Sequence, residues 1–111
     1  DKISVLCRDR RLVLPFSDII YVEIRSHYLC LTLQQSGEKP EVRARLRDFA
    51  AQLPQQLFCQ CHRSYIVNLD HIRRYTRDSL TLSNRDTVPI SQTFAAAFKK
   101  KYDWYYMGNK G

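Results

Sequence analysis

The chain has 111 residues, enough for one domain with a core of its own. Its 44% hydrophobic and 26% charged residues are ordinary for a soluble globular protein, and no apolar run reaches the roughly 18 residues that cross a membrane. Lysine and arginine number 18 against 11 acidic residues, a net charge of +7 that favours a polyanionic partner. Nucleic acid is the first choice, an acidic membrane surface the second, and a merely basic surface the simplest alternative.

The first half of the chain predicts short strands. Residues 3–6 and 12–14 form a hairpin with a charged tip, and residues 20–25 and 28–34 alternate with a period of two, which predicts strands with one buried face each. The turn Arg25-Ser26-His27-Tyr28 contains no glycine, proline or asparagine, which suggests that it is selected for its side chains.

A short strand over 42–45 and an amphipathic helix over 46–53 come next, and Pro54 ends the helix. Arg45 lies just ahead of this helix, where a cation is unfavourable for the helix dipole. A surface or partner role is therefore expected for Arg45.

The segment 57–72 has the densest mixture of core-grade and hydrogen-bonding side chains in the chain. Its histidines, serine and asparagine need partners once the apolar frame is buried, so we expect His62, Ser64 and Asn68 to be mostly architectural.

Strands are predicted over 72–75, 80–82 and 88–90, and apolar side chains then recur at helical spacing from Phe94 to Tyr105. Ser91 is placed to cap this final helix, and residues 107–111 are expected to fray. The result is a mostly β fold with a short internal helix and a C-terminal helix. Because it is not a helix-turn-helix, any contacts to nucleic acid would come from loops or strands.

Metal and redox chemistry are weakly indicated. Cys59-x-Cys61-His62 has the wrong spacing for a structural zinc site and lacks a second ligand pair, so we expect one inward strand face and no metal. Cys7 and Cys30 lie in apolar runs, where free cysteines act as small hydrophobes, which indicates a reducing, cytoplasmic setting.

Catalysis is also weakly indicated. The sequence has no nucleophile elbow, glycine-rich phosphate loop or paired-carboxylate motif. We therefore expect neither an enzyme nor a cofactor.

Polar side chains at the ends of apolar runs are the best candidates for a nucleic-acid interface. Arginine can bind guanine and glutamine adenine through paired hydrogen bonds, whereas lysines and the remaining arginines suit phosphate. RNA remains an alternative partner, although the exposed-aromatic motif of RNA-recognition modules is missing. The candidates are Arg25, His27, Tyr28, Arg45, Arg63, Gln92, Thr93, Lys99 and Lys100.

Four segments in order resemble the LytTR-type DNA-binding domain, the output domain of many bacterial response regulators. They are Asp18-Ile19-Ile20-Tyr21-Val22-Glu23, Leu46-Arg47-Asp48-Phe49 with Leu53, Phe58 through Ile72, and Val88-Pro89-Ile90-Ser91-Gln92. The resemblance covers nearly the whole chain. It implies a single domain over residues 1–111 with an elongated arrangement of small antiparallel sheets.

The resemblance also implies a way of binding double-stranded DNA, with loop side chains in successive major grooves. His27 falls in the first loop, Arg63 at the central contact, and Gln92 and Thr93 in the last loop. Ser91 lies beside that last loop and would be a phosphate contact or a helix cap. Two positions depart from the family pattern: Gln92-Thr93 replaces the common arginine, and Tyr28 stands where a basic residue is sometimes found. We expect a sequence-specific transcription regulator in the cytoplasm rather than a module for RNA, an acidic protein or an anionic membrane.

The family context adds expectations about partners. The domain would be the C-terminal part of a longer response regulator, behind a receiver domain, and would bind repeated promoter half-sites as a dimer.

Overall fold

The computed structural model describes residues 1–108, and strands dominate it, as the alternating patterns predict. In chain order the elements are β1 (Lys2–Leu6), β2 (Arg11–Pro15), a 3₁₀ turn (Phe16–Asp18), β3 (Ile19–Arg25), β4 (Tyr28–Leu33), β5 (Glu41–Val42), α1 (Leu46–Ala50), β6 (Phe58–His62), β7 (Tyr65–Asn68), a second 3₁₀ turn (Leu69–His71), β8 (Ile72–Tyr75), β9 (Ser79–Leu82), β10 (Thr87–Pro89), α2 (Gln92–Asp103) and a π-helical turn (Trp104–Gly108).

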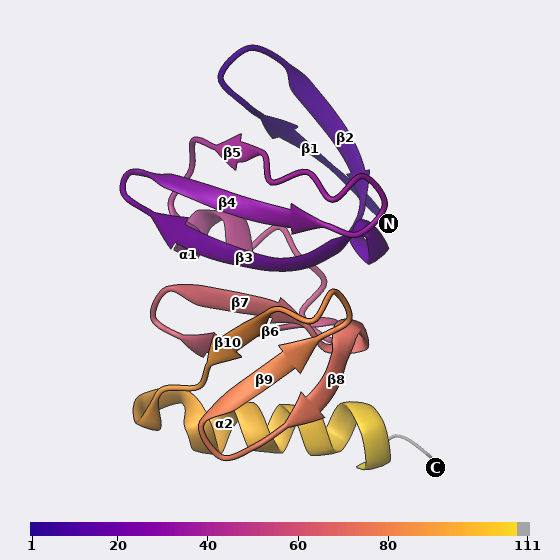
Figure 1. Cartoon of the computed structure of the whole chain (residues 1–111), viewed down its shortest axis with the longest axis vertical. Helices are drawn as coiled ribbons and strands as arrows, with labels where there is room; N and C mark the ends of the chain where they lie inside the picture. Colours follow the sequence, from indigo (N-terminus) through magenta and orange to yellow (C-terminus); the bar gives the residue numbers. More distant parts are fainter. Residues whose placement is uncertain (109–111) are drawn as a thin grey trace.

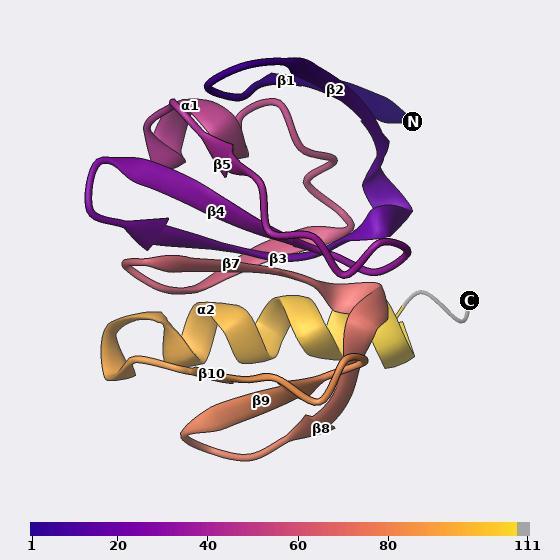
Figure 2. The same cartoon turned by 45° about the horizontal axis from the view of Figure 1, so that its top comes forward.

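Three small antiparallel sheets are stacked along the long axis of the molecule (Figure 1). The central sheet has the order β5-β4-β3-β7-β6, with the β1–β2 hairpin on one side of it and the β10-β9-β8 sheet on the other. Helix α2 covers the end beyond β6, and Figure 2 shows it running beside β7 and β10. The principal extents are 42 × 29 × 25 Å, so the expected elongated arrangement is confirmed.

The central sheet has a hydrophobic core on each face. Ile19 and Val22 of β3 belong to the core under the β1–β2 hairpin and α1, whereas Ile20 and Tyr21 belong to the core shared with β8–β10 and α2. We expected one buried face for β3, and this was wrong because its first four residues are all buried. A strand covered by a layer on each side buries apolar side chains of both alternating sets.

Two predicted boundaries differ from the structure. The strand expected over 42–45 ends at Val42, and the extended residues that follow lead into α1. Helix α1 is five residues long, shorter than predicted, and turn-like hydrogen bonds continue its path as far as Leu53. Leu46, Phe49 and Leu53 are buried along this path.

The C-terminal end also differs from the prediction. Met107 and Gly108, expected to fray, form part of the π-helical turn, while residues 109–111 lie outside the described residues.

Two buried polar side chains of the 57–72 segment connect it to the chain ahead of β3. Asn68 Nδ2 donates to the Phe16 and Ile19 carbonyls at 3.3 and 3.0 Å, and its Oδ1 accepts from the Asp70 N–H at 2.9 Å. His71 Nε2 lies 2.8 Å from the Ser17 carbonyl, which can only accept, so this nitrogen carries the proton. The architectural role expected for Asn68 is confirmed, and His71, to which the sequence analysis gave no role of its own, finds its partners in the same way.

Helix α2 packs one face on β6 and the C-terminal core, as its apolar spacing predicts. Phe98 is completely buried and meets the Tyr75 ring edge-to-face at 5.4 Å. Lys101 Nζ donates to the Phe58 carbonyl at 2.8 Å, which satisfies an acceptor on the outermost strand of the central sheet. Within residues 1–108, no helix is long and apolar enough to cross a membrane.

Candidate nucleic-acid interface

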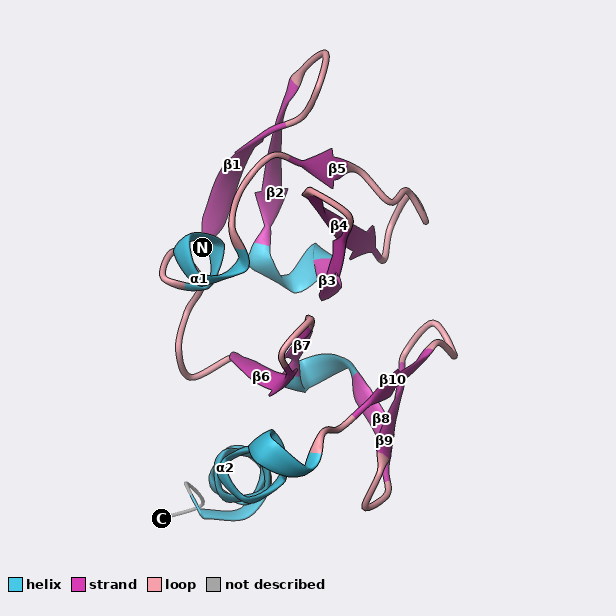
Figure 3. Cartoon of the chain, turned by 90° about the vertical axis from the view of Figure 1, so that its left-hand side faces the viewer, coloured by secondary structure: helices cyan, strands magenta, loops and turns pink. Residues whose placement is uncertain are grey.

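Three turns that are far apart in the sequence lie along one edge of the molecule. They are the β3–β4 turn (25–28), the β6–β7 turn (62–65) and the junction of β10 with α2 (90–93), on the left in Figure 1 and facing the viewer in Figure 3. We call this edge the loop edge. It brings together His27, Arg63, Gln92 and Thr93, which the sequence analysis selected from three separate segments.

The β3–β4 turn presents His27 on a tight, constrained backbone. Only Ser26 and His27 separate the paired residues Arg25 and Tyr28, and Ser26 has φ of 56°, in the left-handed region that favours glycine. His27 is exposed at the tip. A two-residue turn with an unfavourable serine agrees with selection for side chains rather than for backbone ease.

Tyr28 lies between two arginines that the sequence analysis did not connect with it. Arg8 from the β1–β2 tip donates to the Tyr28 hydroxyl oxygen at 3.5 Å, and the Arg43 guanidinium carbon lies 5.7 Å from the centre of the ring. The Arg8 hydrogen bond, followed by the hydrogen bond and charge of Arg43, lowers the pKa of Tyr28. Arg8, Tyr28 and Arg43 come from three separate segments of the sequence, and only the tertiary fold shows that they meet.

Arg25 is held by an acid rather than left free. Its Nε lies 3.5 Å from Glu23 Oε1, and the Tyr65 hydroxyl donates to Glu23 Oε2 at 3.0 Å. Glu23 therefore joins the β3 end of the loop edge to β7. Burial, followed by the Glu23 hydrogen bond, raises the pKa of Tyr65, which keeps this hydroxyl a donor at neutral pH.

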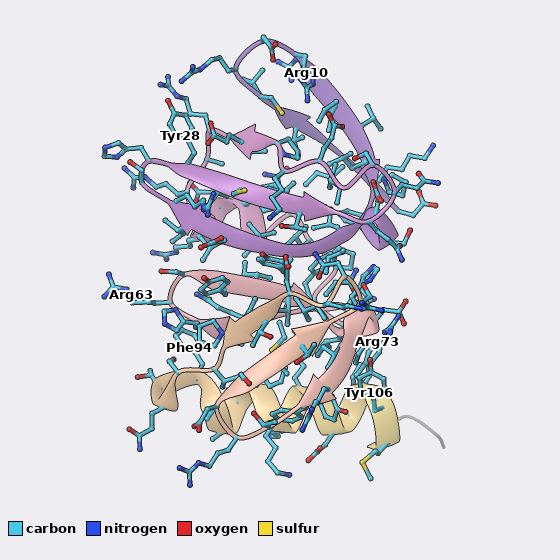
Figure 4. The ribbon with its side chains drawn as sticks, in the orientation of Figure 1. Arg10, Tyr28, Arg63, Arg73, Phe94 and Tyr106 are labelled. Carbon is cyan, nitrogen blue, oxygen red and sulfur yellow. The ribbon has the colours of Figure 1, made fainter. Side chains whose placement is uncertain are left out.

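The β6–β7 turn is braced by its own neighbours. The Ser64 N–H donates to His62 Nδ1 at 3.0 Å, and Gln60 Nε2 donates to the carbonyls of His62 and Arg63 at 3.1 and 3.4 Å. These bonds confirm the architectural role of His62. The Arg63 side chain extends away from the body of the molecule (Figure 4).

The junction of β10 with α2 is fixed to β6 by the Ser91 N–H, which donates to the Cys61 carbonyl at 3.0 Å. Gln92 and Thr93 begin α2 with exposed side chains. Ser91 has the extended backbone of a cap residue, but its hydroxyl does not bond to the first turn, so the predicted side-chain cap is wrong. The buried Ser91 Oγ has no hydrogen-bond partner within residues 1–108.

The remaining candidates lie at different distances from the loop edge. Arg45 and His27 line the same surface hollow beside the β3–β4 turn. Lys99 and Lys100 lie about two helical turns beyond Gln92, roughly 10–12 Å along the axis of α2. Lys99 is also paired, because its Nζ lies 2.7 Å from Asp103 Oδ2.

The cysteines form part of the interior. All four are buried free thiols, and burial raises the pKa of Cys61 to about 12 and also raises that of Cys59. A thiol with so high a pKa is a poor nucleophile at neutral pH. The inward strand face expected for Cys59 and Cys61 is confirmed, and across residues 1–108 no cluster of three or more potential metal ligands occurs.

The domain is thus an elongated, mostly β fold with exposed loop side chains along one edge. The LytTr DNA-binding domain family matches residues 9–103, and the chain belongs to this family. It is thus a DNA-binding domain of the kind used in transcription regulation.

A solved structure and curated relatives agree with this assignment. The LytTr DNA-binding domain of a methyl-accepting/DNA response regulator from Bacillus cereus superimposes with a TM-score of 0.78 at 28% identity, over 90% of this chain and 94% of that one. The transcriptional regulatory protein YpdB of Escherichia coli K12 is 28% identical over 90% of this chain and 43% of its own length. The sensory transduction protein LytR of Staphylococcus epidermidis is 32% identical over 84% of this chain and 38% of its own. The chain thus spans about two fifths of the length of these two relatives.

Proposed function

We propose that this domain reads specific base sequences in double-stranded DNA through its loop edge. The observation that carries the proposal is the alignment of exposed His27, Arg63, Gln92 and Thr93 along the 42 Å axis. One turn of duplex DNA is about 34–36 Å long. Because the three turns follow one another along the long axis, the two outer turns would face successive major grooves while the central Arg63 turn faces the groove between them.

Each turn would read bases by a different chemistry. Arg63 is suited to guanine or to a narrow minor groove, and the His27 ring nitrogens can donate or accept at a base edge. Gln92 favours adenine, so the base read at the last turn would differ from that read by an arginine there. Arg25, held by Glu23, would contact the backbone rather than the bases. The Ser91 hydroxyl is buried, so Ser91 would position Gln92 and Thr93 rather than contact DNA.

The larger protein would be a response regulator, as the Bacillus cereus protein with the matching LytTr domain is described. We infer that residues 1–111 are one output domain behind a phosphate-receiving domain, acting in the cytoplasm without catalysis or a cofactor. Receiver-driven dimerisation would place two copies on repeated half-sites, so that the symmetry of the operator matches that of the protein.

The test is selection from a pool of random duplexes at near-physiological salt, with sequencing of the bound fraction. We expect the bound duplexes to share a sequence motif, with each half-site about one turn of the DNA helix long. Enrichment of no motif would contradict sequence reading and leave only the electrostatic attraction of a basic surface. Tighter binding to single-stranded RNA, an acidic protein or anionic vesicles than to any duplex would move the function to that class of partner.

A further inference from the structure

The tip of the β1–β2 hairpin is attached to the central sheet beside the β3–β4 turn. Cys7 makes an isolated antiparallel bridge with Val42, and Val42 in turn pairs with Leu29 of β4. Arg8, which follows Cys7, and Arg43, which follows Val42, thereby come to the start of β4. The two arginines and Tyr28 line one surface hollow together with Leu6, Cys7 and Glu41.

Tyr28 holds the two guanidinium groups on different parts of one side chain. Its hydroxyl oxygen accepts from Arg8 Nη2 at 3.5 Å, and its ring lies under Arg43 at 5.7 Å. Glu41 also lines this hollow, but within residues 1–108 neither Arg8 nor Arg43 has a carboxylate at ion-pair distance. Two like charges thus meet at Tyr28, and Glu41, although it lines the same hollow, forms an ion pair with neither of them.

Arg10, on the same hairpin, shows the contrast. Its guanidinium lies 3.7 Å from Asp9 and 3.6 Å from Glu38, so its charge is already matched. Figure 4 shows Arg10 beside the β1–β2 hairpin and Tyr28 below it, at the start of β4. The unmatched pair instead lies against Tyr28, the residue that follows His27.

We propose that Arg8, Arg43 and the Tyr28 hydroxyl form a clamp for one backbone phosphate of DNA. Guanidinium groups match phosphate oxygens in geometry and charge, and the tyrosine hydroxyl, which accepts from Arg8, still has its own proton to donate. Since Tyr28 directly follows His27, the clamped phosphate lies next to the base that His27 reads. The clamp rests on the proposed DNA binding and adds the β1–β2 hairpin to the bound surface.

Salt dependence measures the clamp independently of base sequence. The variant R8A/R43A is compared with R10A and with wild type on a random-sequence 30-base-pair duplex between 50 and 200 mM salt. Each lost phosphate contact lowers the slope of log affinity against log salt by about 0.9, which is about 3.5-fold in affinity over this range. We expect the double variant to lose one to two such contacts and R10A to change the slope much less.

Two further measurements locate the phosphate. Tyr28→Phe keeps the ring under Arg43 and removes the hydroxyl, so we expect a slope between those of wild type and R8A/R43A. In a duplex that carries a selected motif, a neutral methylphosphonate is placed at each backbone position in turn. At the clamped position the losses from the methylphosphonate and from R8A/R43A should not add, since both remove the same contact.

Each outcome decides the proposal. Equal slopes for R8A/R43A and R10A would overturn the clamp, as would losses that add at every backbone position. Reduced slopes on random DNA without any selected motif would keep the clamp and reject sequence reading. A wild-type domain that binds no duplex would reject both. Thermal unfolding of each variant checks that the exposed substitutions leave the fold intact.

Discussion

The cationic side chains around the β3–β4 turn and those of helix α2 are used differently. Arg8 and Arg43 flank Tyr28 without an acid at ion-pair distance among residues 1–108. On α2, Lys99 is bonded to Asp103 and Lys101 to the Phe58 carbonyl. A net charge of +7 therefore does not locate the DNA-binding surface by itself. The partner of each cation decides whether it is available to a phosphate.

The largest effects are expected at the tips of the loop edge. His27→Ala or Arg63→Ala should cost about 1–3 kcal/mol of binding free energy on a selected operator and little on random DNA, because each removes a base contact. Titration of labelled operator and random duplexes measures both values. Equal losses on the two duplexes would reassign these residues to the phosphate backbone.

A smaller effect, on folding rather than on binding, is expected at Lys101. Lys101→Met removes the donor to the Phe58 carbonyl and should lower the free energy of unfolding by about 1 kcal/mol, or about 4 °C in melting temperature. Lys100→Met is the matched control on the next residue of the helix. If Lys101→Met instead lowered the salt slope of DNA binding without a change in stability, Lys101 would belong with the phosphate contacts.

Lys99 and Lys100 should have a smaller effect on DNA binding than the arginines beside Tyr28. Both were predicted as phosphate contacts. Because Lys99 is already paired with Asp103, Lys100→Ala should lower the salt slope of DNA binding more than Lys99→Ala. Asp103→Asn should increase the contribution of Lys99, since the carboxylate no longer holds the ammonium group. Unchanged slopes in all three variants would remove this face of α2 from the interface.

The smallest effect at neutral pH concerns Cys61, which precedes Arg63 by two residues but faces the core. Its pKa is raised to about 12, whereas an unfolded thiol ionises near 8.5. Above pH 8.5 the unfolded chain loses this proton and the folded chain keeps it, so stability falls as pH rises toward 12. In urea unfolding, the stability difference between wild type and Cys61→Ala should shrink from pH 7.5 to pH 10. A parallel decline of the two proteins would contradict the buried, protonated thiol.

The sequence predicted much of this arrangement where local pattern is sufficient. Alternation located the strands, apolar spacing located α2, and the family resemblance placed His27, Arg63 and Gln92 in separate loops that the structure aligns. The bracing of the β6–β7 turn by His62 was also expected from its position in an apolar frame.

The remaining features depend on contacts between distant segments, which periodicity does not encode. Alternation in β3 could not show that layers would cover both of its faces. The Ser91 hydroxyl was expected to cap α2, but the backbone N–H of Ser91 bonds across to Cys61 and the hydroxyl is buried beside that contact. The meeting of Arg8, Tyr28 and Arg43 joins three segments through the Cys7–Val42 bridge, a pairing with no local signal.

The two-faced central sheet has a consequence for how the domain opens. Since β3 and β7 supply side chains to both cores, displacement of either strand would open both cores at once. We therefore expect partial unfolding to be confined to the outer hairpins and the helix ends, and the paired amides of β3 and β7 to be among the slowest to exchange with solvent. The turns that carry His27 and Arg63 are anchored at the ends of these slowest-exchanging strands, so the domain reaches DNA with its reading side chains already in place.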